Sequence, residues 1–373
     1  MKIKLLLSSL LIATSMNAQT NVNETEPELD ESKATYFYYD DEIHVNSIGY
    51  TKRNLLEEKV YIMENNEIYF QEFIDFVGLV KGTINKETGT ITIKNGQAMG
   101  TKQLTEGGTA HQMYFATMNP TTQQPETGEF TLKYIDKGDG KICIDGGSLC
   151  FALYYMEQEK PIVFLHTKGL KMINEEQIDD KIQKTSYKYV DLDEEEEEGN
   201  GVLESVKYGE NIYFKSLETI IPEKWQVAKV INGNNKMSLF IPNNQFLSYL
   251  ENIYFVFKAA KIDDSGKITE LEGLTLPMTL DASTHTYKCT TAKNDFLGSL
   301  SYTITNSGVK NEWVTKYGNI SIMLPETQVT NGITTVIQPK TQENNQYYDL
   351  QGRAIQHPTR GIYIKNGKKI VIK

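Results

Sequence analysis

The sequence predicts an all-β protein: two tandem antiparallel β modules, each a sandwich or a meander barrel, followed by a small C-terminal β-hairpin tail. Short runs rich in Ile, Val, Tyr, Phe and Thr alternate with Asn, Gly and Asp turns, as in "GTITIKNGQ" and "KMSLFIPNNQ". The aromatic residues lean toward tyrosine, with 22 Tyr against 2 Trp, and tyrosine favours strands and half-exposed surfaces. A block of roughly 145 residues also recurs, which indicates a duplicated unit.

Residues 1–18 have the order of a secretory signal peptide. Two lysines precede an apolar run from Leu5 to Ala13, and small and polar residues lead to Ala18. The apolar run is too short to span a bilayer, so we expect cleavage after Ala18, followed by an acidic linker at 19–32. No other apolar stretch approaches the ~18 residues of a spanning helix, and we therefore expect no transmembrane segment.

The repeat emerges when the chain is compared with itself. Five segment pairs recur in one order and at one approximate spacing, and strands with the same order indicate duplication. The pairs are "YFYYD" at 36–40 with "YKYVD" at 187–191, "NEIYFQEF" at 66–73 with "ENIYFKSL" at 210–217, "LVKGTIN" at 79–85 with "QVAKVIN" at 226–232, "ITIKNGQ" at 91–97 with "LFIPNNQ" at 239–245, and "HQMYFATM" at 111–118 with "ENIYFVFK" at 251–258.

These matches place the first module at residues 33–168 and the second at 184–328. Between them, "GLKMINEEQIDDKIQ" at 169–183 has helical composition, and we expect a linker or a short helix there. A further linker, 329–345, precedes a tail at 346–373.

Charge limits the partners of this protein. The formal net charge is -11, which argues against nucleic acid because binding to nucleic acid depends on a basic patch. The most acidic stretch, "DLDEEEEEGNG" at 191–201, falls just after the first strand of the second module, so we expect a solvated loop. Calcium is the sharper alternative, but consecutive glutamates lack the turn that spaces calcium ligands.

The cysteines suggest one bridge. Cys143 and Cys150 flank "IDGGSL", and a hairpin turn at Asp145 to Ser148 would set the two sulfurs on one face at a spacing that permits a disulfide. The alternative is two small apolar residues packed side by side. For Cys289 we expect burial. Since the chain has no CxxC, we expect no zinc site and no other metal site.

The tail reads as a second, separate sheet. In "GIYIKNGKKIVIK" the Asn366-Gly367 pair predicts a tight hairpin turn. That turn sets Tyr363 opposite Ile370 and Ile362 opposite Val371. Upstream, "QYYDL" predicts another strand. A sheet of this size is marginal alone.

Here the residues carry a resemblance. "YYDLQGR" followed by "GIYIKNGKKIVIK" resembles the C-terminal sorting signal of the type IX, or Por, secretion system of the Bacteroidota. The residues that match are Tyr348, Asp349, Leu350, Gly352, Arg353, Gly361, Tyr363, Asn366, Gly367 and Lys373. The body is similar to uncharacterised tandem β-module secreted proteins of that phylum, which gives no activity.

The resemblance implies a route and a set of partners. The protein would cross the inner membrane by its amino-terminal signal and then pass from the periplasm across the outer membrane. The type IX machinery would recognise the tail, and the product would be released or attached to surface lipopolysaccharide. The expected location is therefore secreted, or on the cell surface of a Gram-negative bacterium.

Catalytic motifs do not emerge from the sequence. The five histidines, His44, His111, His166, His285 and His357, form no HExxH and no pair at metal-binding spacing. There is no GxSxG elbow, no P-loop and no GxGxxG after a strand, so we name no catalytic residue and no cofactor.

The first functional hypothesis is a binding or adhesion protein for a glycan, a host protein or another cell-surface ligand. The alternative is a secreted hydrolase whose glycosidase-like carboxylate pair is hidden among 49 acidic residues.

Aromatic residues are the remaining binding candidates. The pairs Tyr69-Phe70, Tyr213-Phe214 and Tyr254-Phe255 alternate within strands, so one of each pair faces the core, and core packing is the favoured role. Exposed tyrosines on a sheet would instead suit carbohydrate or peptide. Trp225, in a predicted loop after Pro222, is the single aromatic that we name as an exposed binding residue.

Overall fold

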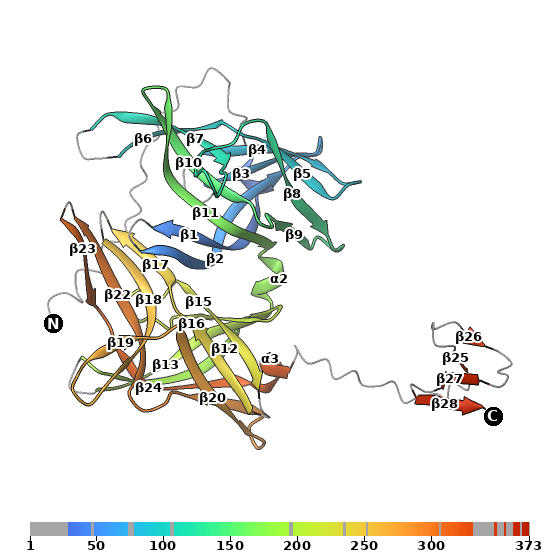
Figure 1. The fold of residues 1–373 in the computed structure, drawn as a ribbon, viewed down its shortest axis with the longest axis vertical. Helices are drawn as coiled ribbons and strands as arrows, with labels where there is room; N and C mark the ends of the chain where they lie inside the picture. The colour runs from blue at the N-terminus through green and yellow to red at the C-terminus, as the bar shows by residue number, and fades with distance from the viewer. Residues whose placement is uncertain are drawn as a thin grey trace. The chain divides into compact units, whose positions relative to one another are not determined.

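The computed structural model (Figure 1) divides the chain into a body, Met1–Val329, and a tail, Thr330–Lys373. It describes residues 29–45, 48–73, 78–104, 108–193, 197–233, 236–250, 253–305, 307–330, 347–348, 354–355, 361–365 and 368–372. The predicted signal peptide lies outside these residues. Within them the protein is all-β, as predicted, and helix is confined to η1 (Glu31–Lys33), α2 (Glu176–Asp179) and α3 (Glu326–Thr330). No described helix has the length and apolar character needed to cross a membrane.

In the part of the chain that the structure describes, eight strands of the first module form a closed ring. Each is antiparallel to the next, and β11 returns to pair with β1. Around the ring the strands are β1 (Thr35–Val45), β2 (Gly49–Ile62), β3 (Glu67–Gln71), β4 (Leu79–Asn85), β5 (Thr90–Lys94), β8 (Glu129–Asp136), β9 (Ile142–Asp145) and β11 (Lys160–Asn174). A ring of this size encloses an interior that side chains can fill.

A side sheet branches from the first barrel. The early half of β11 pairs with β10 (Cys150–Glu157), which continues to β7 (Ala110–Thr117) and β6 (Gln97–Gln103). The later half of β11 pairs with β9 instead. One long strand therefore belongs to both the barrel and the side sheet.

The second module closes the same ring with strands of its own, again antiparallel throughout. They are β12 (Gln183–Asp191), β13 (Glu197–Tyr208), β14 (Asn211–Lys215), β15 (Trp225–Gly233), β16 (Lys236–Pro242), β20 (Gly273–Asp281), β21 (Thr286–Thr290) and β24 (Tyr317–Pro325). Its side sheet runs from β24 through β22 (Asp295–Thr305) and β18 (Ile253–Ile262) to β17 (Gln245–Leu250). Two added strands, β19 (Ile268–Glu270) and β23 (Gly308–Trp313), extend it.

The order of strand pairing is therefore the same in the two modules, which Figure 1 colours blue to green and green to orange. The glutamines of the "NGQ" and "NNQ" turns also make equivalent hydrogen bonds. The side-chain amide of Gln97 bonds the N–H and C=O of Lys81 and the C=O of Lys94. That of Gln245 bonds the N–H and C=O of Val227 and the C=O of Pro242. Each turn glutamine thus ties its turn to the neighbouring strand of its barrel.

The strand pairs correct part of the sequence alignment. The Tyr-Phe segments of β3 and β14 align as predicted, but Tyr69 pairs with Lys81 whereas Tyr213 pairs with Val227. Lys81 is thus equivalent to Val227, one residue away from Ala228, with which the sequence match aligns it. Phe115 is equivalent to Phe257, and not to Phe255 as the match of 111–118 with 251–258 predicts, because Phe115 and Phe257 pair with the two turn glutamines. Strands of alternating composition carry too little information to set their own register.

Each barrel has a hydrophobic core of its own. Phe37, Phe70 and Phe151 belong to the first core, and Phe214 and Phe257 belong to the second. A third cluster joins the modules and combines Tyr38, Leu55, Ile173, Ile178, Val206, Tyr213, Trp225 and Val227. The modules are therefore two cores that share a packed interface within one compact body.

The boundary between the modules differs from the prediction. β11 does not end at 168 but runs on to Asn174, because Leu170 and Met172 face the first core and are 1% exposed. The expected short helix is α2, and β12 begins at Gln183. Half of the predicted linker is thus strand.

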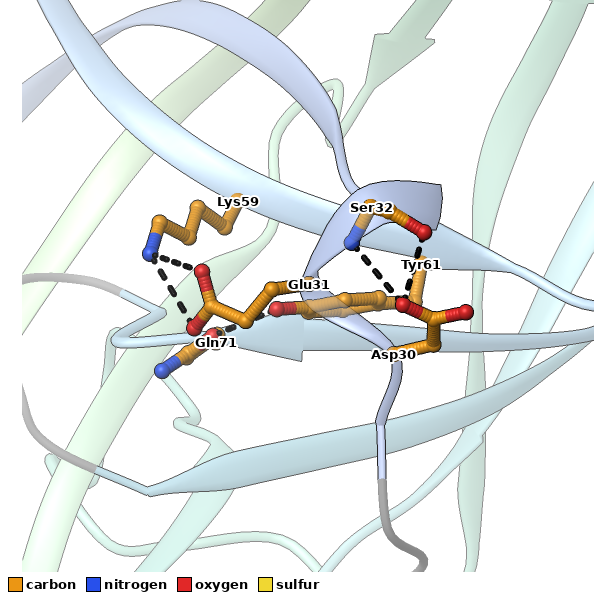
Figure 2. Close-up of polar contacts among 6 residues, drawn as sticks. All are labelled: Asp30, Glu31, Ser32, Lys59, Tyr61 and Gln71. Atoms are coloured by element: carbon orange, nitrogen blue, oxygen red, sulfur yellow. Dashed lines mark hydrogen bonds and ion pairs between the residues drawn. The ribbon is translucent and has the colours of Figure 1, made fainter.

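The body begins before the predicted first module. In η1 the Asp30 carboxylate accepts hydrogen bonds from the N–H and hydroxyl of Ser32, and Glu31 pairs with Lys59 of β2 at 3.2 Å (Figure 2). Beside them, the Tyr61 hydroxyl donates to Gln71 across β2 and β3. Since the Glu31 side chain is 70% exposed, this ion pair contributes little to stability.

The acidic run is largely part of a hairpin and not a free loop. β12 ends at Asp191 and β13 starts at Glu197, and these two residues pair. The predicted loop therefore contracts to 192–196, of which 194–196 lie outside the described residues. Lys316 lies 2.5 Å from Asp193 and offsets part of the charge there.

The cysteine hairpin does not form. β9 and β10 do not pair with each other but follow one another along the same edge of β11, where Cys143 pairs with Ile173 and Cys150 with Lys168. Gly146, whose N–H donates to Leu170 at 2.9 Å, carries the chain from one strand to the next without reversing it. The described structure holds Cys143, Cys150 and Cys289 as free thiols, and Cys289 is fully buried as expected.

The described tail residues form four short strands, β25 (Tyr347–Tyr348), β26 (Ala354–Ile355), β27 (Gly361–Lys365) and β28 (Lys368–Ile372). The hairpin register is as predicted, with Tyr363 opposite Ile370 and Ile362 opposite Val371. The other named tail residues, Asp349, Leu350, Gly352, Arg353, Asn366, Gly367 and Lys373, lie outside the described residues.

Candidate functional site

Trp225 is not an exposed binding residue. It is the first residue of β15, only 6% exposed, and packs in the cluster that joins the modules. The ammonium of Lys215 lies 5.5 Å from its ring centroid. The sequence placed Trp225 in a loop because Pro222 lies just before it, but the chain enters β15 at Trp225 and carries its side chain into the interface.

The tyrosines of the repeated strand motif are buried as favoured. Tyr69 and Tyr213 are 5% and 2% exposed, and Phe70 and Phe214 are fully buried. Tyr254 is different, because it lines a cavity.

That cavity is a groove of about 540 Å³ between the two modules. Binding pockets for small molecules fall in the range of about 300–1,000 Å³. The first module contributes residues from β1, β10 and β11, and the second contributes residues from β17, β18 and β22. Aromatic side chains come from both modules: Tyr155 and Phe164 from the first, and Phe246, Tyr249 and Tyr254 from the second.

The second-module wall is a pair of tyrosines. Tyr249 and Tyr254 are partners in the β17–β18 hairpin, so their rings lie side by side, with centroids 6.1 Å apart and planes at 28°. Tyr249 is 52% exposed, whereas burial raises the pKa of Tyr254. A broad aromatic face thus opens to the groove, and ligands with flat apolar faces stack on such surfaces.

The first-module wall combines aromatic rings with one cation. Phe164 is 39% exposed, and the Lys102 ammonium lies 4.8 Å from its ring centroid. Tyr155, on the neighbouring strand β10, packs on His111 with ring centroids 4.5 Å apart. The side chains that line this wall are therefore mainly apolar, with Lys102 supplying the charge.

Two histidines stack in the groove lining. His44 of β1 and His166 of β11 are direct register partners, and their rings lie 4.4 Å apart at 15°. The Tyr50 hydroxyl lies 3.2 Å from Nδ1 of His166. This pair was missed because 44 and 166 are far apart in sequence, and only the pairing of β1 with β11 brings them together.

Both imidazoles are held in the neutral form. Burial, together with His44 and Lys168, lowers the pKa of His166 to about 4. Burial and then Lys168 also lower the pKa of His44. At neutral pH each ring therefore offers one hydrogen-bond donor and one acceptor.

The charge of the groove differs from that of the chain. Among its described lining residues Lys102 is the one Lys or Arg, and none is a carboxylate. The whole chain has a formal net charge of -11. The described lining of the groove thus contains no acidic side chain, although the chain as a whole is acidic.

A second cavity, of about 340 Å³, also lies between the modules and is lined by Asp40, Tyr213 and Glu210 among others. Burial raises the pKa of the Asp40 carboxyl. Its two oxygens already accept hydrogen bonds, from the Leu55 N–H at 2.9 Å and from the Tyr213 hydroxyl at 2.5 Å. Asp40 therefore joins the modules instead of facing a ligand with a free oxygen.

Among the described residues no group of three or more His, Cys, Asp or Glu side chains could hold a metal ion. Comparisons of the chain with protein-family models, with curated proteins and with solved structures found no match.

Proposed function

We propose that this chain is an exported binding protein, secreted or held at the cell surface, whose ligand occupies the groove between the modules. The observation that carries the proposal is the shared construction of the groove. Each module alone supplies one aromatic wall, and the packed interface holds the two walls over one cavity. A binding site that needs both copies gives the duplication a function.

Export is part of the same proposal. It is supported by the order of residues 1–18 and by the resemblance of the tail to a type IX sorting signal, with the hairpin register of β27 and β28 in agreement. The tail is also a compact unit of its own, as an address that is read separately requires. The type IX machinery would be the first partner, and surface lipopolysaccharide would be the anchor of a product that stays on the cell.

Deletion of Gly361 to Lys373 tests the route. We expect the folded protein to accumulate in the periplasm, as measured by fractionation of a Bacteroidota host. A matched control replaces Lys368 and Lys369 with glutamine, which keeps the hairpin length and separates the role of the sheet from that of its charge. Normal appearance of the deletion variant in the medium or on the surface would contradict the export proposal.

Substitution of Tyr249 tests the groove. The full-length protein should bind to intact cells or to a glycan array, and Tyr249→Ala should lose that binding because the exposed stacking face is removed. Leu280→Ala is the matched control: Leu280 is 42% exposed on β20 and does not line the groove. Equal binding by both variants, with unchanged thermal unfolding, would refute the assignment of the site.

The hydrolase alternative is not supported by this groove. Glycosidases place two carboxyl groups roughly 5–9.5 Å apart across the scissile bond. The described lining of the groove contains no carboxylate, and in the second cavity Asp40 has both oxygens bonded within the protein. We therefore do not assign a hydrolytic activity.

A further inference from the structure

The groove has the features that sugars use. The axial C–H groups of a pyranose ring form a weakly positive face, which packs on the negative face of an aromatic ring. Tyr249 and Tyr254 offer two such faces from one hairpin, and Phe164 offers a third from the first module. A cavity of about 540 Å³ has room for more than one ring.

Polar groups between these walls suit hydroxyls. The neutral His44 ring carries one donor and one acceptor, whereas Nδ1 of His166 already bonds the Tyr50 hydroxyl and leaves Nε2 of that ring. Sugar hydroxyls can hydrogen-bond such ring nitrogens. The Gln123 side chain adds an exposed amide to the lining. A purely apolar ligand would desolvate these groups without replacing the hydrogen bonds that water supplies, which is unfavourable.

The positive charge of Lys102 in the groove lining favours acidic sugars over neutral ones. Lys102 lies over the Phe164 ring at 4.8 Å, and no described lining residue is a carboxylate. Lys168 lies outside the groove lining but beside the two histidines, whose pKa values it helps to lower, and its ammonium lies 3.8 Å from the Tyr50 ring centroid. Its side chain also pairs with Glu42 at 3.3 Å, which offsets part of that charge.

We infer that the groove binds an acidic saccharide, that is, pyranose rings bearing carboxylate or sulfate groups, with the rings on Tyr249 and Tyr254 and one anionic group at Lys102. This inference rests on the proposed function, because it names the ligand class of the same site. Free anions alone would not use the aromatic walls, and neutral sugars would not use Lys102.

Calorimetric titration of the mature full-length protein tests the ligand class. The probes are a trimer of galacturonic acid, its methyl ester, a heparin-derived tetrasaccharide and maltotriose. We expect at least one of the two acidic probes to bind. Esterification, or exchange for the neutral sugar, should weaken binding by about tenfold, the scale of one hydrogen bond to a charged group.

Two variants locate the contacts. Lys102→Gln removes the positive charge beside Phe164 and keeps a polar side chain, and it should weaken the acidic probe by about the same tenfold while leaving the neutral probes unchanged. Tyr249→Ala should remove binding of every saccharide. Leu280→Ala should change neither, and thermal unfolding of each variant checks the fold.

The outcomes separate the two proposals. If maltotriose and the methyl ester bind as well as the acids, and Lys102→Gln has no effect, the acidic class is wrong although the groove stands. If no probe binds while Tyr249→Ala still abolishes binding to cells, the saccharide inference is overturned and the proposed function survives. If Tyr249→Ala changes neither assay, the groove itself is wrong.

Discussion

The two modules share one closed ring of strands and one glutamine-bonded turn, but the turn glutamine is half-buried in the first module and fully buried in the second. Gln97 and Gln245 make the same three hydrogen bonds to their own barrels. Gln245 is 0% exposed, because its turn lies in the interface, where its amide oxygen also accepts from Asn54 of the first module at 2.9 Å. The local sequence determines the turn and its hydrogen bonds, whereas contact with the other module determines how much those bonds contribute to stability.

The modules also bury a carboxylate in different ways. The first pairs Asp41 with Arg53 in a bidentate contact, at 2.7 Å and 2.5 Å, with both side chains 0% exposed. The second holds Glu218 with neutral donors: the Ile220 N–H and the hydroxyls of Thr315 and Tyr317. Mutation of the ion pair and mutation of the neutral hydrogen-bond donors around Glu218 should therefore change the free energy of unfolding by different amounts.

The largest effect is expected at the ion pair. Asp41→Ala leaves the Arg53 guanidinium buried without its carboxylate, so the free energy of unfolding should fall by about 3–5 kcal/mol. Urea unfolding measures the loss. The double variant Asp41→Ala, Arg53→Met is the control, and should recover part of the loss because it also removes the buried guanidinium that Asp41 neutralises. A loss below about 1 kcal/mol in the single variant would contradict the pairing.

The turn glutamines give the next effect. Gln245→Ala should cost about 2–3 kcal/mol, because three backbone groups and Asn54 lose a buried partner. Gln97→Ala should cost about 1 kcal/mol, because water can replace its bonds. The two variants are matched, so the difference between their unfolding midpoints reports the interface alone. Equal losses would mean that the interface adds nothing.

The sequence predicted features that depend on neighbours along the chain. Alternation gave the strands, the Asn366-Gly367 pair gave the register of Tyr363 with Ile370, and the "NGQ" and "NNQ" turns aligned the modules correctly. Turn residues carry this information because each has a specific bonding role, which a strand residue in an alternating run lacks.

Features that depend on distant partners were missed. The His44–His166 stack needs β1 beside β11, and the burial of Trp225 needs the first module against β15. The sequence left a sandwich and a barrel open, and the pairing of β11 with β1, at the two ends of the module, decides for the barrel. Sequence periodicity reports which face of a strand is apolar but not which strand lies next to it.

The buried Glu218 carboxyl predicts a smaller effect, a dependence of stability on pH. Burial raises the pKa of Glu218 above its ordinary value, so the folded state holds the proton more tightly than the unfolded state does. Its contribution to stability is therefore full below about pH 4.5 and is lost as pH rises through the raised pKa. Glu218→Gln should remove the part of the fall in the unfolding midpoint above pH 4.5 that Glu218 causes, and should change stability by no more than about 1 kcal/mol where the carboxyl is protonated. An unchanged pH profile would contradict the raised pKa.

The smallest effect on stability is expected at the cysteines, where the comparison of modules is most direct. In the second module β21 and β22 follow one another along β24, as β9 and β10 follow along β11, and the connecting residues 291–294 contain no glycine pair. In both modules, therefore, two successive strands pair with the same neighbouring strand one after the other and do not form a hairpin. The turn around Gly146 makes this connection in the first module, so Cys143 and Cys150 do not lie opposite each other.

Thiol counting on the denatured mature protein should find three free thiols. Cys143→Ala, at a half-buried site beside Gln177 and Tyr208, should cost at most about 1 kcal/mol, and should leave the count at two. A count of one in the unmutated protein would mean that β9 and β10 come together as a hairpin after all, and that the two modules differ in topology at this step.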